Sequence, residues 1–282
     1  MKILMSSPFV SQTINKTRSL LFLSYMLSYK TFHKSSQAEW VTFIHGAGGS
    51  SSIWYKQIRD FKDNFNVLLI DLRGHGRSKG VKLKRFERYS FDSIGNDVIE
   101  VMNHLKIEKS HFVGMSLGTV IIRELSERYP ERIERMVLGG AVMKINLKGQ
   151  VLMRLGVWLK SVVPYLLLYR LFAFVIMPKK NHRHSRNFFI QEARKLYQKE
   201  FVKWFSLVVE VNPLLAFLRS KDPGIKSLYV MGEQDHMFLP SVTNLVKQHA
   251  SAALHVIPAC GHVVNIDRPE EFNRASIAFL QA

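Results

Sequence analysis

The chain has 282 residues, of which 47% are hydrophobic, and its formal net charge is +18. This length and composition predict one large globular domain, with or without an inserted subdomain, and exclude a disordered chain. The charge is uneven, because residues 142–213 carry 13 basic and 3 acidic side chains. Such an imbalance bears on partners and solubility rather than on fold. Nucleic acid is not the expected partner, since no recognised nucleic-acid-binding motif accompanies the charge.

Cysteine content and hydropathy bear on location. Cys260 is the only cysteine, which excludes an internal disulfide and is compatible with a reducing compartment, so we expect a cytoplasmic protein. The apolar run nearest to a membrane span, residues 162–177, is interrupted by Arg170 and falls short of the roughly 18 uncharged residues that a span needs. Residues 20–25 and 27–33 predict a hairpin that enters the sheet. A secretory signal or N-terminal anchor is the alternative, disfavoured because no small-x-small cleavage site follows.

Strand and helix patterns alternate from residue 40 to residue 141, which predicts a doubly wound, mostly parallel sheet of the α/β class. Ser90 is the expected N-cap of one helix, because a serine hydroxyl can accept a hydrogen bond from the first free amides. The strands are expected at residues 40–44, 66–70, 111–113 and 133–138, and the helices at residues 53–65, 90–105 and 119–129.

The alternation stops at residue 142. The later elements are expected to be amphipathic helices over residues 144–213, strands at 227–231 and 254–257, and a last helix at 269–280 capped by Asp267. We therefore predict a core formed by residues 1–141 and 214–282. Residues 142–213 are expected to form a helical cap inserted over the catalytic end of the sheet.

Three glycine-bearing segments follow predicted strands: residues 45–52, residues 71–78 and the turn at Ser116. Ligands of open α/β sheets bind outside the carboxyl ends of the strands, so these segments predict one shared cleft. Residues 45–52 lack the Gly-Lys-Ser/Thr ending and the G-x-G-x-x-G spacing of nucleotide-binding loops. The charges of residues 71–78 are expected to be solvated or mutually paired as a scaffold.

The strongest chemical signal is Gly-Met-Ser-Leu-Gly at residues 114–118, at the end of an apolar run and directly before a helical pattern. A strand, sharp turn and helix in this order raise the Ser116 hydroxyl above the end of a sheet. Gly114 and Gly118 are expected to be glycines for steric reasons, because strand and helix pass too closely for a Cβ atom.

A serine nucleophile needs a general base and an acid that orients the base. His262 and Asp235 each follow a predicted strand, and Ser116, Asp235, His262 is the chain order expected for such an elbow. Glu233 is the rival of Asp235, and His236 is expected to be merely exposed. Cys260 lies beside His262 but has no elbow, so we do not expect it to be the nucleophile.

Two further features bear on the site. Acyl transfer needs donors for the oxyanion, and we expect the backbone N–H groups of Leu117 and, from the loop at residues 45–47, of Ala47. His182 and His184 have a spacing that could bind a metal, but no carboxylate or cysteine is near them in the sequence. An exposed basic turn is expected there, and no metal.

With these residues in view, the chain resembles the α/β-hydrolase superfamily, and among its members most of all the esterases, lipases and enol-lactonases with a helical cap. The resemblance is carried by residues 45–49, 71–78, 114–118, 232–235 and 261–262. It implies a Ser-His-Asp triad and no cofactor. Dehalogenases and epoxide hydrolases of the superfamily carry aspartate at the elbow, so Ser116 argues against both.

One departure limits the resemblance. The superfamily often has Met-Gly-Gly after its serine, whereas this chain has Leu117-Gly118-Thr119. That weakens transfer from subfamilies defined by the fuller motif, such as the carbon–carbon bond hydrolases.

The expected function is a serine hydrolase that cleaves a carboxylic ester with a medium aliphatic or aromatic acyl group. Two alternatives stay open: a non-catalytic ligand- or partner-binding protein, and a monoacylglycerol or lysophospholipid lipase whose basic cap contacts an anionic membrane. Most of the aromatic side chains in residues 142–213 are expected to form the core of the cap and line the cleft: Trp158, Tyr165, Tyr169, Phe172, Phe174, Phe188, Phe189, Tyr197, Phe201, Trp204 and Phe205.

Overall fold

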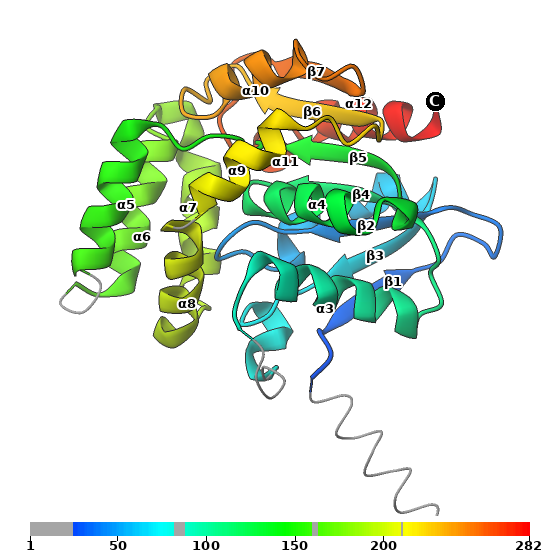
Figure 1. The fold of residues 1–282 in the computed structure, drawn as a ribbon, viewed down its shortest axis with the longest axis horizontal. Helices are drawn as coiled ribbons and strands as arrows, with labels where there is room; N and C mark the ends of the chain where they lie inside the picture. The colour runs from blue at the N-terminus through cyan, green and yellow to red at the C-terminus, as the bar shows by residue number, and fades with distance from the viewer. Residues whose placement is uncertain (1–24, 82–87, 160–162, 210) are drawn as a thin grey trace, which may run out of the picture.

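A sheet lies at the centre of the computed structural model, which describes residues 25–81, 88–159, 163–209 and 211–282 (Figure 1). In these residues seven strands pair in the order β1-β3-β2-β4-β5-β6-β7. Only β1 is antiparallel to its neighbour, so the predicted mostly parallel sheet is confirmed. The strands are β1 (Tyr29–Phe32), β2 (Trp40–Ile44), β3 (Asn66–Ile70), β4 (Ser110–Met115), β5 (Ile133–Gly139), β6 (Ser227–Gly232) and β7 (Ala252–Ile257).

Both faces of the sheet are covered, which explains why its strands are uniformly apolar. Successive residues of one strand enter different hydrophobic clusters: Leu68 packs in one and Val67 and Leu69 in the other. The first cluster includes side chains of α3 (Phe91–His104), α4 (Leu117–Arg128) and α10 (Leu239–Val246). The second includes side chains of α2 (Ile58–Lys62), α11 (Val264–Asp267) and α12 (Pro269–Gln281).

Five helices lie between β5 and β6 in the chain, beyond the carboxyl ends of the strands, at the left of Figure 1. They are α5 (Leu147–Leu159), α6 (Tyr165–Ile176), α7 (Arg183–Ala193), α8 (Gln198–Val209) and α9 (Val211–Ser220). Residue 214, the expected start of the second core segment, lies within α9. The carbonyl of Leu218 in this helix accepts a hydrogen bond from Arg123 of α4.

Local expectations fare differently. The Ser90 cap is confirmed, because its hydroxyl accepts a hydrogen bond from the Ser93 amide at 3.1 Å and Ser93 returns the bond. The continuous helix expected at residues 53–65 is wrong: a 3₁₀ turn at Ser51–Trp54, in which the Ser50 hydroxyl accepts from the Ser52 amide, precedes the separate helix α2. Of the expected N-terminal hairpin, the second arm forms β1 and pairs with β3. The first arm lies outside the described residues except for residue 25.

The expected cap of the last helix is also wrong. Arg268, not Asp267, is the N-cap residue of α12, and no side chain caps that helix end. Asp267 instead ends α11, and its carboxylate accepts a hydrogen bond at 3.4 Å from the Gly261 amide, next to His262. Burial raises the pKa of the Asp267 carboxyl above its usual range. Because α11 ends at Asp267 and α12 begins at Pro269, the Asp267 side chain faces the loop that carries His262 and does not cap α12.

Within the described ranges no single helix is long and apolar enough to cross a membrane. One pair of helical segments, Gln198–Leu207 and Val211–Ser220, meets the length and composition test jointly, with a bend of 46° between them.

Candidate active site

Ser116 lies in a strained turn between β4 and α4. Its φ of 52° and ψ of −119° are adopted by few residues other than glycine. The glycines on either side permit the turn: a Cβ on Gly118 would lie 2.3 Å from the Ile44 carbonyl oxygen, and one on Gly114 would lie 3.1 Å from the Gly118 carbonyl carbon. The close approach of strand and helix expected from the sequence is therefore present.

Ser116, His262 and Asp235 form one hydrogen-bonded chain. The Ser116 Oγ lies 2.9 Å from His262 Nε2, and His262 Nδ1 lies 2.7 Å from Asp235 Oδ2. The other carboxylate oxygen, Oδ1, accepts a bond at 3.2 Å from the Phe238 amide, which fixes the plane of the carboxylate. Asp235 and His262 are almost completely buried, so water does not compete for these bonds.

The structure separates Asp235 from Glu233, and Ser116 from Cys260. Glu233 is exposed and accepts a hydrogen bond at 2.9 Å from the Ala259 amide. His236 is exposed, as expected. Cys260 is buried, and burial raises the pKa of its thiol to about 12, so it is not an activated nucleophile.

The two expected oxyanion donors belong to segments that pack together. Leu117 begins α4. A Cβ added to Gly46 would lie 3.0 Å from the Ser116 Cβ and 3.7 Å from the Leu117 backbone nitrogen, so the loop that carries Ala47 runs along the elbow. Ala47, Ser116 and Leu117 line the same pocket. This placement is compatible with two backbone donors beside the serine.

Residues 71–78 contact the loop at residues 45–52, and their charged side chains Asp71 and Arg73 are buried and bonded, whereas Arg77 is exposed. Arg73 is buried and binds both carboxylate oxygens of Asp97, at 2.8 and 2.5 Å. Asp71 accepts a bond at 2.6 Å from the Ser51 amide of the loop at residues 45–52. Two buried histidines cross between the loops: His45 Nε2 accepts from the Leu72 amide, and His75 Nε2 accepts from the Gly48 amide. Charged and imidazole side chains therefore hold the loops at residues 45–52 and 71–78 together beside the site.

The two buried histidines of these loops predict that the protein loses stability in acid. Burial lowers the pKa of His75 to about 3 and also lowers that of His45, because a buried imidazolium is poorly solvated. The unfolded chain takes up these protons near pH 6.5 and the folded chain does not, so stability is present above pH 6.5 and falls as the pH is lowered toward 3. For His75 we expect a loss of about 3 kcal/mol in unfolding free energy over two pH units. Urea unfolding at several pH values measures it.

The matched comparison uses two single variants. His75→Gln removes the titrating group and should flatten the dependence of the unfolding free energy on pH. His236→Gln removes an exposed imidazole and should leave that dependence unchanged. An equal pH dependence in His75→Gln and wild type would contradict the assignment.

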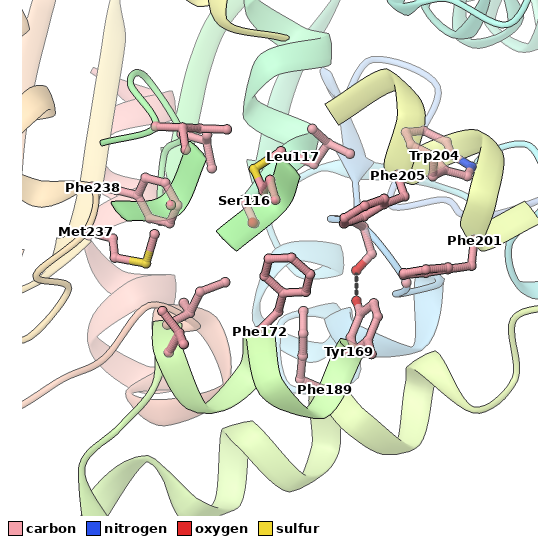
Figure 2. Close-up of a pocket in the computed structure, with 18 of the residues that line it drawn as sticks. Ser116, Leu117, Tyr169, Phe172, Phe189, Phe201, Trp204, Phe205, Met237 and Phe238 are labelled. Carbon is pink, nitrogen blue, oxygen red and sulfur yellow. Dashed lines mark hydrogen bonds between the residues drawn. The ribbon is translucent and has the colours of Figure 1, made fainter. Parts of the chain in front are cut away.

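A residue of α6 reaches the loop at residues 45–52; we call the helices α5 to α9 the cap. The Tyr169 hydroxyl donates a hydrogen bond to the Ala47 carbonyl (Figure 2). The Gly48 N–H of the same peptide group donates to His75 Nε2 at 2.9 Å. This peptide is therefore held from the cap on one side and from the core on the other, directly after the Ala47 N–H. The sequence placed Tyr169 only among the aromatic lining, since nothing in its spacing signals a bond made by its hydroxyl.

Tyr169→Phe is expected to lower kcat by about tenfold and to change KM little, because a misplaced oxyanion donor affects the transition state more than substrate binding. Steady-state ester hydrolysis separates the two constants. Tyr165→Phe is the matched control, since its hydroxyl donates to the Leu196 carbonyl within the cap at 2.8 Å. Equal loss of kcat in both variants would show a general effect of cap stability.

The pocket above Ser116 is a cavity of about 150 Å³ lined almost entirely by apolar side chains. Figure 2 shows Ser116 and Leu117 on one side and cap aromatics facing them. No side chain of its described lining is charged. The aromatic residues that the cap contributes are Tyr169, Phe172, Phe189, Phe201, Trp204 and Phe205.

The cap is also tied to the loops by polar contacts. Glu192 of α7 accepts hydrogen bonds from Ser50 and Ser52, at 3.0 and 2.9 Å. His182 is buried, so the exposed turn expected there is wrong for this residue, although His184 is exposed. The reason is that His182 packs against the loop at Gly261 and its Nε2 bonds Gln234, beside Asp235, at 2.8 Å.

Comparison with known proteins follows this geometry. The profile of the alpha/beta hydrolase fold family matches residues 39–269. A putative carbamate hydrolase, RutD, of Acinetobacter baylyi is 26% identical over 90% of this chain and 98% of its own. The 3-oxoadipate enol-lactonase 2 of the same organism is 32% identical, but that match spans only 43% of each chain. The crystal structure of the enol-lactonase from Burkholderia xenovorans LB400 superposes with a TM-score of 0.73, at 21% identity, over 91% of this chain and 96% of that one. This chain therefore belongs to the alpha/beta hydrolase fold family and is a hydrolase.

Proposed function

We propose that this hydrolase cleaves carboxylic esters through an acyl-enzyme on Ser116, with His262 as general base and Asp235 as the residue that orients the base. The observation that carries the proposal is the continuous bond chain from Ser116 Oγ through His262 to Asp235. The backbone amides of Leu117 and Ala47 are the proposed oxyanion donors. Relatives named as an enol-lactonase and a carbamate hydrolase support hydrolysis at an acyl carbon.

The hydrogen-bond geometry supports the following proton path. Asp235 accepts the Nδ1–H of His262, which leaves Nε2 free to accept the Ser116 hydroxyl proton. The Ser116 oxygen attacks the ester carbonyl, and the oxyanion points to the two amides. The tetrahedral intermediate then expels the alcohol, which takes the proton from Nε2. Water repeats the sequence on the acyl-enzyme, giving the acid and free Ser116.

The chemistry of the pocket supports a proposal for the acyl group. Since the described lining carries no charged side chain, it offers no counter-ion for a carboxylate on the substrate. Aromatic side chains from the cap enclose the space over Ser116. We therefore propose an uncharged acyl group, medium aliphatic or aromatic, as the preferred one.

The test combines turnover with covalent labelling. p-Nitrophenyl esters from acetate to palmitate are expected to show an optimum at medium chain length, and a fluorophosphonate is expected to modify the peptide that contains Ser116. Heat-unfolded protein is the control for nonspecific labelling. Labelling without ester hydrolysis would contradict the proposed substrate class. Absence of both would favour a ligand-binding protein without turnover.

A further inference from the structure

The outer faces of α5 and α6 expose apolar side chains. Of the ten large apolar side chains that are exposed in the described parts of the chain, six lie on these two helices. We call them the cap stripe: Leu147, Val151 and Trp158 on α5, and Leu167, Leu171 and Phe174 on α6. Trp158 is 85% and Leu147 is 75% exposed. Clustered exposure of this kind marks a surface that contacts something apolar.

The same faces are basic. Arg154 lies between Val151 and Trp158 along the α5 face, Arg170 lies beside Leu171 on α6, and both arginines are exposed. No Asp or Glu occurs between Glu134 and Glu192 in the sequence. The stripe therefore lacks any acidic neighbour on its own helices, and its partner must combine apolar surface with negative charge.

The inner faces of these helices border the pocket. Met153 of α5 and Phe172 of α6 line it together with Ser116. The helices are neighbours, since a Cβ on Gly156 of α5 would lie 3.6 Å from the Phe172 ring. About 10 Å, one helix diameter, therefore separates the cap stripe from the pocket. In Figure 1 both helices lie at the left edge of the molecule, on the side opposite α12.

From these observations we infer that the cap stripe docks onto an anionic membrane surface, with α5 and α6 lying in the plane of the lipid headgroups. The helices have 13 and 12 residues. Each spans about 20 Å, less than the roughly 30 Å of a hydrocarbon core, so they suit the interface and not a crossing. Apolar side chains enter the acyl boundary while arginines meet lipid phosphates.

Charge decides between a membrane and a second copy of this chain. A symmetric dimer through the stripe would bring Arg154 and Arg170 of both copies together without an acidic partner on α5 or α6. An anionic bilayer provides negative charge for these arginines, and its interface also accommodates the exposed side chain of Trp158. Docking extends the proposed function to single-chain amphiphilic esters, and that extension alone rests on Ser116 as nucleophile.

The test is flotation of the full chain with phosphatidylcholine vesicles that contain or lack phosphatidylglycerol, at low and high salt. Wild type is expected to bind the anionic vesicles, with affinity falling by about tenfold at high salt. The stripe variant Trp158→Ser/Leu167→Ser/Leu171→Ser and the charge variant Arg154→Gln/Arg170→Gln should each bind about tenfold or more weakly. Tyr55→Ser/Phe217→Ser removes two exposed aromatic side chains outside α5 and α6 and should bind as wild type does.

Three results would overturn the inference. The first is the absence of wild type from the anionic vesicle fraction. The second is a stripe variant that floats as well as wild type, which would assign binding to another part of the chain. Light scattering that shows a wild-type dimer and a monomeric stripe variant would assign the surface to a second copy. Fluorophosphonate labelling and hydrolysis of a soluble short ester, measured on the same samples, confirm that each variant is folded. If wild type shows neither fluorophosphonate labelling nor ester hydrolysis but still binds the anionic vesicles, the proposed function is contradicted and the inference of membrane docking is not.

Discussion

Ser116→Ala is expected to lower kcat/KM for p-nitrophenyl esters by about 10⁵-fold or more. Alanine cannot form the acyl-enzyme, and His262 Nε2, which lies 2.9 Å from the serine oxygen, is left without a hydroxyl to activate. The remaining rate should come from the oxyanion donors and from substrate binding alone. Steady-state hydrolysis with the preferred chain length measures the loss, and fluorophosphonate labelling should vanish with it.

The controls for this variant are structural. Ser116→Ala keeps the backbone turn and removes one oxygen, so its unfolding midpoint should stay close to that of wild type. Ser220→Ala removes a hydroxyl that bonds the Phe217 carbonyl on the surface and should keep full activity. Residual activity within tenfold of wild type in Ser116→Ala would overturn the acyl-enzyme mechanism.

Asp235→Asn is expected to lower kcat by about 10⁴-fold. The Phe238 amide donates to Asp235 Oδ1 and would hold the amide oxygen of asparagine in that place. The new NH₂ group would then face His262 Nδ1 and donate to it. That selects the wrong imidazole tautomer, in which Nε2 carries the proton and cannot accept one from Ser116.

Glu233→Gln is the matched comparison, because Glu233 is the other carboxylate of the same loop. Its bond to the Ala259 amide tolerates an amide oxygen, so kcat should stay within about twofold of wild type. A large loss in Glu233→Gln together with an active Asp235→Asn would reassign the orienting acid.

Several parts of the site could be predicted because their signals are local. The elbow is recognisable from Gly114, Ser116 and Gly118. Each glycine is needed because a Cβ atom there would clash with backbone a few residues away or on the adjacent strand. The Ser90 cap is likewise a contact between neighbours, reaching only to Ser93. Strand order could not be read this way, but apolar runs covered on both faces predicted a parallel sheet.

Two other expectations, for Asp267 and His182, also rested on local signals but were wrong. Asp267 has the position of a cap in the sequence, yet its carboxylate turns to the Gly261 amide. His182 looks like part of a basic turn, yet it is buried against Gly261 and Gln234, residues that the chain reaches only after β6. For His182 a partner distant in the sequence outweighed a local preference, whereas Asp267 bonds a residue only six positions away, on the other side of α11.

The sequence by itself determined the elements, the elbow and the set of candidate acids and bases, since hydrophobic periodicity, glycine sterics and helix caps act over a few residues. Only the tertiary structure decided which candidates meet. Asp235 and Glu233 both carry a carboxylate and lie two residues apart. The Asp235 carboxylate faces the buried imidazole of His262, whereas that of Glu233 is exposed. The bond from Tyr169 to the Ala47 carbonyl joins residues 122 positions apart. Contacts of this length depend on how the helices pack over the sheet, a property that no local pattern encodes.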